Sequence, residues 1–354
     1  MKFAPSNAAE FNGSQRSADQ VAKAGRSIFA GARAWPWCVL GFGVLAACFD
    51  SALTTDLAPW PFVVALLFFG MPHGCADWVV SARLSGHVGL WSKINGFAGY
   101  LCQMLACLAL MATLPGVATL LFFALTIIHF GMADATAVGA DKDGFVARWG
   151  LALGRGMLLL STAIAAHPVA AWAPFEQIGI ALSAWQHGAA SVWMPALEPM
   201  RQYALIGVGS GVVLALASAF ARTRRGHARA AVADLVEHGL VATLAALADP
   251  LFAVGIFFLG VHAFRHTRRL ACTSVVISVP FTRSGFMVRL ARVHVISLPL
   301  LWATIPCMIP LCLLFGGLSA YSLAVGSIAF YMITTLPHHL LGLRLPSADL
   351  SPAA

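Results

Sequence analysis

Histidine is the informative residue in this chain of 354 residues, of which 59% are hydrophobic and only 10% are charged. A polar ring in hydrocarbon is retained when something satisfies its nitrogens, and neutral imidazole suits iron, copper and zinc as a ligand. Six of the twelve histidines fall inside long apolar stretches, toward their carboxyl ends: His73, His129, His262, His266, His338 and His339. This group is a candidate metal site.

The spacing of one pair strengthens that interpretation. His262 and His266 are four residues apart, which places both imidazoles on one face of a helix. A lone HxxxH is weak evidence, and a single histidine inside a membrane more often forms a hydrogen bond between helices than ligates a metal. Four apolar stretches that deliver histidine at a similar depth favour the metal site over that simpler interpretation.

Carboxylates accompany the histidines. Ligating histidines usually donate their second N–H to a carboxylate or a carbonyl. Asp77 follows His73 by four residues, Asp134 follows His129 by five, and Glu237 enters another apolar stretch at a similar depth. We predict that these carboxylates orient the imidazoles. The other histidines are predicted at loops or span ends, except that the role of the one beside Glu237 stays open: His87, His167, His187, His227, His294 and His238.

The elements that must position these residues are membrane helices. A spanning helix needs about twenty mostly apolar residues, and the sequence supplies about ten such stretches. We therefore predict an all-α, polytopic integral membrane bundle of about ten transmembrane helices, with an interfacial hairpin over Trp172–Met200. The predicted spans are Trp35–Leu53, Trp60–Val80, Ile94–Leu114, Gly116–Ala135, Trp149–Ala166, Tyr203–Ala221, Ala230–Leu247, Leu251–Arg265, His294–Phe315 and Gly317–Leu341.

Charge sets the expected orientation. The formal net charge is +8, but the basic residues lie in short clusters between apolar runs, which indicates membrane topology and not nucleic-acid binding. We predict a bacterial inner-membrane protein with both termini and the histidine layer on the cytoplasmic side. Residues 1–34 are predicted to be a disordered tail, 35–342 the membrane domain that carries the chemistry, and 343–354 a short tail. The eight cysteines form no CxxC pair and are interpreted as packing residues.

Four motifs, in order between Trp60 and Leu341, resemble those of the Brp/Blh family of membrane β-carotene 15,15′-dioxygenases. The stretch Gly70-Met-Pro-His73-Gly-Cys-Ala-Asp77 resembles GxPHGxxD, and His129-Phe-Gly-Met-Ala-Asp134 resembles HxGxxD. The stretch from Pro250 to His262-Ala-Phe-Arg265-His266 resembles a third motif that ends in HSxRH, and Pro337-His338-His339 resembles PHH.

The resemblance implies a non-haem Fe(II) enzyme that uses dioxygen to cleave the central double bond of β-carotene, giving retinal for a rhodopsin-type protein in the same membrane. It places the iron ligands at four histidines and supporting roles at Asp77, Asp134, Glu237 and His338. The implied ligands are His73, His129, His262 and His266.

Two residues depart from the family pattern. Ala263 stands where the family usually has Ser, and Phe257 where it often has Tyr. Both departures remove a hydroxyl group near the implied iron. We therefore expect the hydrocarbon to be preferred over hydroxylated carotenoids.

Three alternative functions remain open from the sequence. A membrane desaturase or hydroxylase also uses histidine boxes, but of the HxxHH type, and this chain has one HxxxH; two irons per chain would favour that class. A b-type haem protein also uses paired histidines and would show a Soret band. A transporter or a carotenoid-binding accessory protein would bind metal or pigment without consuming oxygen.

Overall fold

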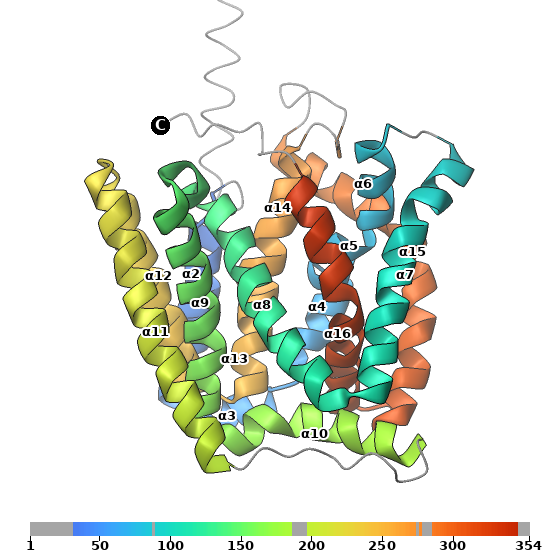
Figure 1. Ribbon diagram of the computed structural model, residues 1–354, viewed down its shortest axis with the longest axis horizontal. Helices are drawn as coiled ribbons and strands as arrows, with labels where there is room; N and C mark the ends of the chain where they lie inside the picture. Colours follow the sequence, from blue (N-terminus) through green and yellow to red (C-terminus); the bar gives the residue numbers. More distant parts are fainter. Residues whose placement is uncertain (1–30, 87–88, 186–196, 274–275, 278–284, 346–354) are drawn as a thin grey trace, which may run out of the picture.

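The computed structural model describes residues 31–86, 89–185, 197–273, 276–277 and 285–345. Within these ranges the chain consists of helices and their connections, without a strand. Most of the helices run side by side through one bundle, while α10 (Pro168–Trp185) lies across one end of it (Figure 1). The prediction of an all-α fold is confirmed.

Long apolar helices form most of this bundle. Seven of them are long and apolar enough to cross a membrane. These are α7 (Leu90–Thr113, apolar from Ile94), α8 (Pro115–Ala137), α9 (Phe145–Ala166), α11 (Leu197–Arg224), α12 (Ala228–Leu247), α15 (Phe286–Leu314) and α16 (Ala320–Arg344).

Shorter helices complete the described chain. They are α2 (Ala34–Phe49), α3 (Ser51–Asp56), α4 (Trp60–Leu67), α5 (Gly70–Cys75), α6 (Asp77–Leu84), the 3₁₀-helix η1 (Ala140–Asp143), α13 (Pro250–Phe257), the π-helix η2 (Phe258–Ala263) and α14 (Phe264–Cys272). Residues 60–84 count as an eighth span if α4 and the following helices, bent by 40°, are taken together.

The polytopic membrane bundle is thus confirmed, but the expected count of about ten spans is not. Two of the predicted spans fall short of a regular spanning helix. α2 has only 16 residues, and the predicted span Leu251–Arg265 is divided among α13, η2 and α14. Both segments still run through the bundle beside the longer helices (Figure 1).

The bend between α4 and α5 depends on Gly70. A Cβ atom at this position would lie 2.7 Å from the carbonyl oxygen of Ala65 and 2.7 Å from the ring of Phe258. Glycine therefore lets the chain turn tightly against η2, and it is the first residue of the motif that contains His73. Gly70 is therefore required for close packing, and it also lies near the candidate site in the chain.

A second motif glycine brings α8 and α9 together. A Cβ atom on Gly131 would lie 1.8 Å from the carbonyl oxygen of Ala152, and one on Gly156 would lie 2.4 Å from that of Ile127. The two backbones touch because small residues allow helices in a membrane to approach closely. Since His129 is two residues before Gly131, this contact also fixes the position of His129.

The described chain begins and ends at the same end of the bundle. Arg265 on α14 donates a hydrogen bond to the carbonyl of Ala32, and Arg269, one turn later, donates one to Leu345. This placement is what an even number of crossings requires, while the cytoplasmic identity of that end stays a prediction. α16 continues to Arg344, beyond the predicted boundary at residue 342.

Some sequence predictions fall on residues outside the described ranges. Residues 1–30 of the predicted tail and residues 346–354 are among them. The interfacial hairpin is described only in part, since residues 186–196 lie outside. Its residues 172–185 belong to α10, which lies across the bundle end as an interfacial segment would, while its residues 197–200 form the first turn of α11 (Figure 1).

Replacement of Gly131 by Ala should separate α8 from α9, because the backbone of Ala152 cannot yield to the new methyl group. We expect the free energy of unfolding in detergent to fall by about 1–3 kcal/mol, the usual cost of overpacking. Gly209→Ala is the matched control, since a Cβ atom there meets nothing within 4 Å. Equal stability of the two variants in thermal unfolding would contradict the close contact.

Candidate active site

Five buried imidazoles from five separate elements form one cluster. His73 lies on α5, His129 on α8, His262 on η2, His266 on α14 and His338 on α16. Each side chain belongs to a residue at most 7% exposed. The ring centroids are 5.0 Å apart for His73 and His338, 5.1 Å for His129 and His338, 4.9 Å for His266 and His338, 4.6 Å for His129 and His262, and 5.0 Å for His73 and His266.

Hydrogen bonds fix the orientation of two of these rings. His73 Nδ1 lies 2.6 Å from the carbonyl oxygen of Phe69, and His338 Nδ1 lies 2.6 Å from Asp77 Oδ2. Each oxygen accepts from a protonated nitrogen, so a neutral ring in either position has its proton on Nδ1 and its lone pair on Nε2. This tautomer leaves Nε2 available to a ligand.

The remaining nitrogens are unusual for a buried site. His262 Nδ1, both ring nitrogens of His266, and His338 Nε2 are buried without a hydrogen-bond partner. His129 Nδ1 faces Nδ1 of His339 at 3.2 Å on the rim of the cluster. Buried polar atoms are nearly always satisfied in native proteins, so this set of orphaned nitrogens calls for an explanation such as a bound ion.

The donor chemistry of the cluster fits a metal such as iron, since the groups gathered there are imidazoles and imidazole nitrogen is a common iron ligand. The rings are not yet arranged as ligands. Among the described residues, no three His, Cys, Asp or Glu side chains are placed so that they could hold a metal ion as they stand. To hold a metal ion, the imidazoles would have to rotate about their side-chain bonds. A ring whose nitrogens have no hydrogen-bond partner can rotate without breaking a hydrogen bond.

The predicted carboxylates lie nearby but contact other groups than expected. Asp77 bonds His338 and not His73, whose Nδ1 is taken by the carbonyl of Phe69. Asp134 lies 3.0 Å from Arg265 and does not orient His129 through a hydrogen bond; Glu237 receives a bidentate pair from Arg265 at 2.6 and 2.8 Å. The expectation that all three carboxylates hold imidazoles is therefore wrong for Asp134 and Glu237.

These two carboxylates belong to a buried network of four guanidinium groups and four carboxylates, whose formal charges cancel. Burial of a single charge in hydrocarbon is costly, and breaking such a pair is strongly destabilising. The pairs are Arg33 with Asp234, Arg155 with Asp134 and Glu237, Arg222 with Asp143 and Asp234, and Arg265 with Asp134 and Glu237.

Arg265 connects this network to the histidines. It lies between His262 and His266 in the chain, and its side chain is fully buried against the carboxylates of α8 and α12. The segment that carries both histidines is thereby anchored from behind. Sequence analysis missed this role, although the position of an arginine between two candidate ligands in an apolar stretch was a signal.

The HxxxH pair begins in a π-helix. η2 covers Phe258–Ala263 and adds one wide turn between α13 and α14. The ring centroids of His262 and His266 are 6.2 Å apart, so the two imidazoles do share a side of the segment. Single π turns inside α-helices occur frequently at functional sites. The sequence predicted a regular helix here.

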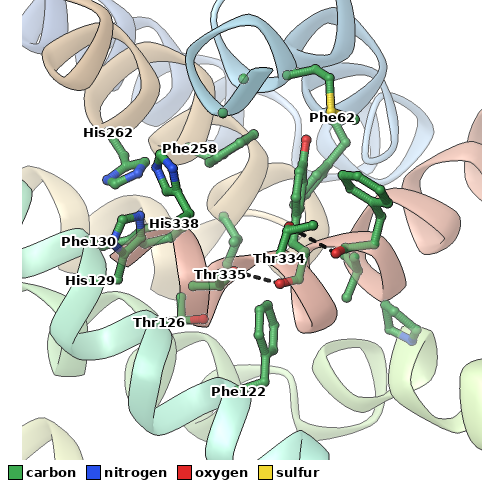
Figure 2. A pocket seen from close by; sticks show the side chains of 18 of the residues that line it. Phe62, Phe122, Thr126, His129, Phe130, Phe258, His262, Thr334, Thr335 and His338 are labelled. Carbon is green, nitrogen blue, oxygen red and sulfur yellow. Dashed lines mark hydrogen bonds between the residues drawn. The ribbon is translucent and has the colours of Figure 1, made fainter. Parts of the chain in front are cut away.

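One wall of an apolar cavity of about 380 Å³ is formed by four of the histidines, His73, His129, His262 and His338. Figure 2 shows His129, His262 and His338 turned toward one another at one side of it, with aromatic rings around the rest. None of the residues that line this cavity carries a formal charge. The aromatic lining consists of Phe62, Phe97, Tyr100, Phe122, Phe123, Phe130, Phe175, Phe258, Phe330 and Tyr331.

The hydroxyl groups of this cavity are mostly occupied. Thr304, Thr334 and Thr335 each donate to the carbonyl oxygen four residues earlier in their own helix. The hydroxyls of Thr126 and Tyr331 have no hydrogen-bond partner. A ligand in this cavity therefore meets carbon atoms, imidazole edges and few free polar groups.

The two departures from the family motifs do not act as expected. Phe257 and Ala263 are both fully buried, and neither lines the cavity. The ring of Phe257 packs on Phe130 at a centroid distance of 5.5 Å. The neighbouring Phe258 faces the cavity instead, so the missing hydroxyls do not change its wall.

The other described histidines lie outside the cluster. His167 contacts the carbonyl of Ala246, His227 contacts Asp143, His294 contacts the carbonyl of Phe68, and His238 contacts the carbonyl of Asp234. His87 and His187 lie outside the described residues. These contacts give the described four a local packing or hydrogen-bonding role.

Comparison with known proteins identifies relatives. The family model described as beta-carotene 15,15′-dioxygenase matches residues 64–345. The chain is 25% identical over 335 residues to the probable beta-carotene 15,15′-dioxygenase Blh of Halobacterium salinarum, a match that covers 90% of this chain and 93% of that protein. It is 32% identical over 82 residues to the beta-carotene 15,15′-dioxygenase of the uncultured marine bacterium 66A03, covering 23% and 30% of the two chains. No solved structure matches significantly.

Asparagine substitutions should distinguish a carboxylate that bonds a histidine, Asp77, from one that pairs with arginines, Asp134. Asp77→Asn weakens the acceptor that orients His338, whose ring packs against those of His73, His129 and His266, so we expect any metal affinity of the cluster to fall about 10- to 100-fold with little loss of stability. Asp134→Asn removes a charge that two buried arginines share, so we expect it to lower the free energy of unfolding by about 3 kcal/mol. Metal titration and thermal unfolding of both variants test this, and the reverse pattern would contradict the assignment.

Proposed function

Because the chain belongs to the β-carotene 15,15′-dioxygenase family, we propose that it cleaves the central double bond of β-carotene with dioxygen and releases retinal. The observation that carries this proposal is the cluster of buried imidazoles at the wall of an uncharged, aromatic-lined cavity. A polyene is an uncharged, flat and apolar molecule, and such a wall suits it. β-Carotene dissolves in the bilayer, so a site inside the membrane needs no extraction of the substrate into water.

We propose Fe(II) as the cofactor, held by His73, His129, His262 and His266. Iron bound there would supply open coordination positions for dioxygen beside the alkene. The protein itself positions the substrate and keeps water out of the site. Asp77 holds His338 at the cluster, and the aromatic residues keep the polyene in place and exclude water from the reacting carbons.

The proposed cellular setting is based on the same family assignment and on the distribution of basic residues between the apolar stretches. We propose an inner-membrane enzyme with a cytoplasmic amino terminus, bilayer lipids as its surroundings, and a rhodopsin-type protein as the recipient of retinal. Co-expression in a β-carotene-producing bacterium tests the reaction directly. Loss of colour together with retinal in the extract would support it, and unchanged carotenoid in cells that contain the folded protein would contradict it.

Alanine substitutions test the proposed ligands. Replacement of His73, His129, His262 or His266 should abolish retinal formation and lower the bound iron, because each removes one imidazole from the coordination sphere. His227→Ala is the control, since that side chain is 56% exposed and pairs with Asp143 away from the cluster. Retinal yield and iron content are measured on the same preparations. An active His262→Ala variant with full iron content would rule out the site as proposed.

The cavity also predicts the choice among carotenoids. A dihydroxy carotenoid would bury its ring hydroxyls mainly among carbon atoms, since three of the six cavity hydroxyls already bond their own helix and that of Tyr100 bonds Asp77. An unpaired buried hydroxyl costs about 1–3 kcal/mol, so we expect kcat/KM for β-carotene to be higher by about 10-fold or more. Parallel assays with β-carotene and zeaxanthin measure this ratio, and a preference for the hydroxylated substrate would contradict it.

A further inference from the structure

The cavity that contains the histidines reaches the outer surface of the bundle between α7 and α15. Most of its lining residues are buried or half-buried, but Leu101 on α7 is 47% exposed, and Ala303 and Cys307 on α15 are exposed as well, as is Ala170 on α10 at the opposite end. Residues that are at once exposed and part of the lining mark a place where the cavity is open. Leu101, Ala303 and Cys307 belong to α7 and α15, both of which pack on α16.

The arrangement of the helices explains this opening. α7 packs on α16, α8 and α6, while α15 packs on α16, α5 and α14. Within the described part of the chain, α7 and α15 share almost no contact with each other. The gap between them is backed by α16, whose residues Phe330, Tyr331 and Thr334 line the cavity behind it.

The opening lies close to the histidines. Tyr100, next to Leu101, bonds Asp77, and Asp77 bonds His338. On the other side, Thr304, next to Ala303, lies 3.9 Å from the sulfur of Cys75, two residues after His73. Two short chains of contacts therefore join the rim of the opening to the cluster.

The surroundings of the opening are hydrocarbon. α7 exposes its apolar residues almost throughout, and a spanning helix with an exposed apolar surface faces lipid. Neither the rim nor the lining carries a formal charge. A ligand that passes here must be uncharged and already dissolved in the bilayer.

We propose that the gap between α7 and α15 is the lateral window through which the carotenoid passes from the bilayer to the histidine cluster. This inference rests on the proposed function for the identity of the substrate. The window, defined by Leu101, Ala303 and Cys307, admits the polyene edge-on from the lipid, and α16 guides it toward His338. The opposite end of the cavity lies against α10, where Ala171, Pro174 and Phe175 line it.

A matched pair of substitutions tests the window. Leu101→Trp places a large ring on the rim, whereas Leu105→Trp, one turn further along α7, places the same ring at a residue that is 63% exposed and does not line the cavity. Ala303→Trp and Ile305→Trp form the equivalent pair on α15. Two independent rim variants keep the test decisive if one of them fails to fold, and unchanged iron content serves as the folding check.

The measurement is the rate at which β-carotene associates with the full-length, iron-loaded protein in lipid nanodiscs without oxygen. Binding is monitored by the circular dichroism that an achiral polyene acquires when it is bound to a protein. Both rim variants should slow association at least about 10-fold, and both controls should stay within about twofold of the natural protein. Equal rates in rim and control variants, or no association with the natural protein, would overturn the window. Admission of oxygen afterwards tests the reaction separately: bound carotenoid that passes the window but yields no retinal contradicts the proposed function alone.

Discussion

The cost of polar atoms in hydrocarbon is the constraint on which this structure depends. Four arginines and four carboxylates lie among apolar helices, and each is tolerated because the charges satisfy one another. Their side chains come from α8, α9, α11, α12, α14, η1 and the residue before α2. A network that needs so many elements at once specifies how they assemble, because any misplaced helix would leave a charge unpaired.

The segment from η2 to α14 separates this charged network from the cavity. Arg265 faces the carboxylates of α8 and α12, while His262 and His266 on the same segment face the other imidazoles. Rigid packing of the arginine thus holds the histidines without using their nitrogens. Buried atoms without a hydrogen-bond partner occur in both groups, but in the network each of their residues still pairs with an opposite charge, whereas neither ring nitrogen of His266 has any partner. This difference favours the cluster as the place where a ligand belongs.

Sequence reasoning predicted the all-α membrane bundle and the convergence of its histidines because both depend on simple regularities: stretches of about twenty apolar residues, and a shared depth on helices of one direction. It failed where the outcome depends on side-chain direction. Their depth along the helices predicted that Asp134 and Glu237 contact the imidazoles, but the tertiary packing shows that they form ion pairs with arginines. The π turn and the burial of Phe257 away from the cavity are equally invisible to periodicity, since one added residue per turn rotates every following side chain.

His338 shows that a sequence motif does not by itself define the role of a residue. The resemblance gave it a supporting place, yet its ring lies among those of His73, His129 and His266 and lines the cavity. Its hydrogen bond to Asp77 fixes the proton on Nδ1 and leaves Nε2 buried without a partner. An imidazole whose second N–H bonds a carboxylate or a carbonyl is the arrangement that metal ligands usually have; His73 has it through the carbonyl of Phe69, and His338 has it through the carboxylate of Asp77. The cluster therefore offers one imidazole more than the four that the motifs imply, and the contact with Asp77, not the position in the sequence, decides what His338 can do.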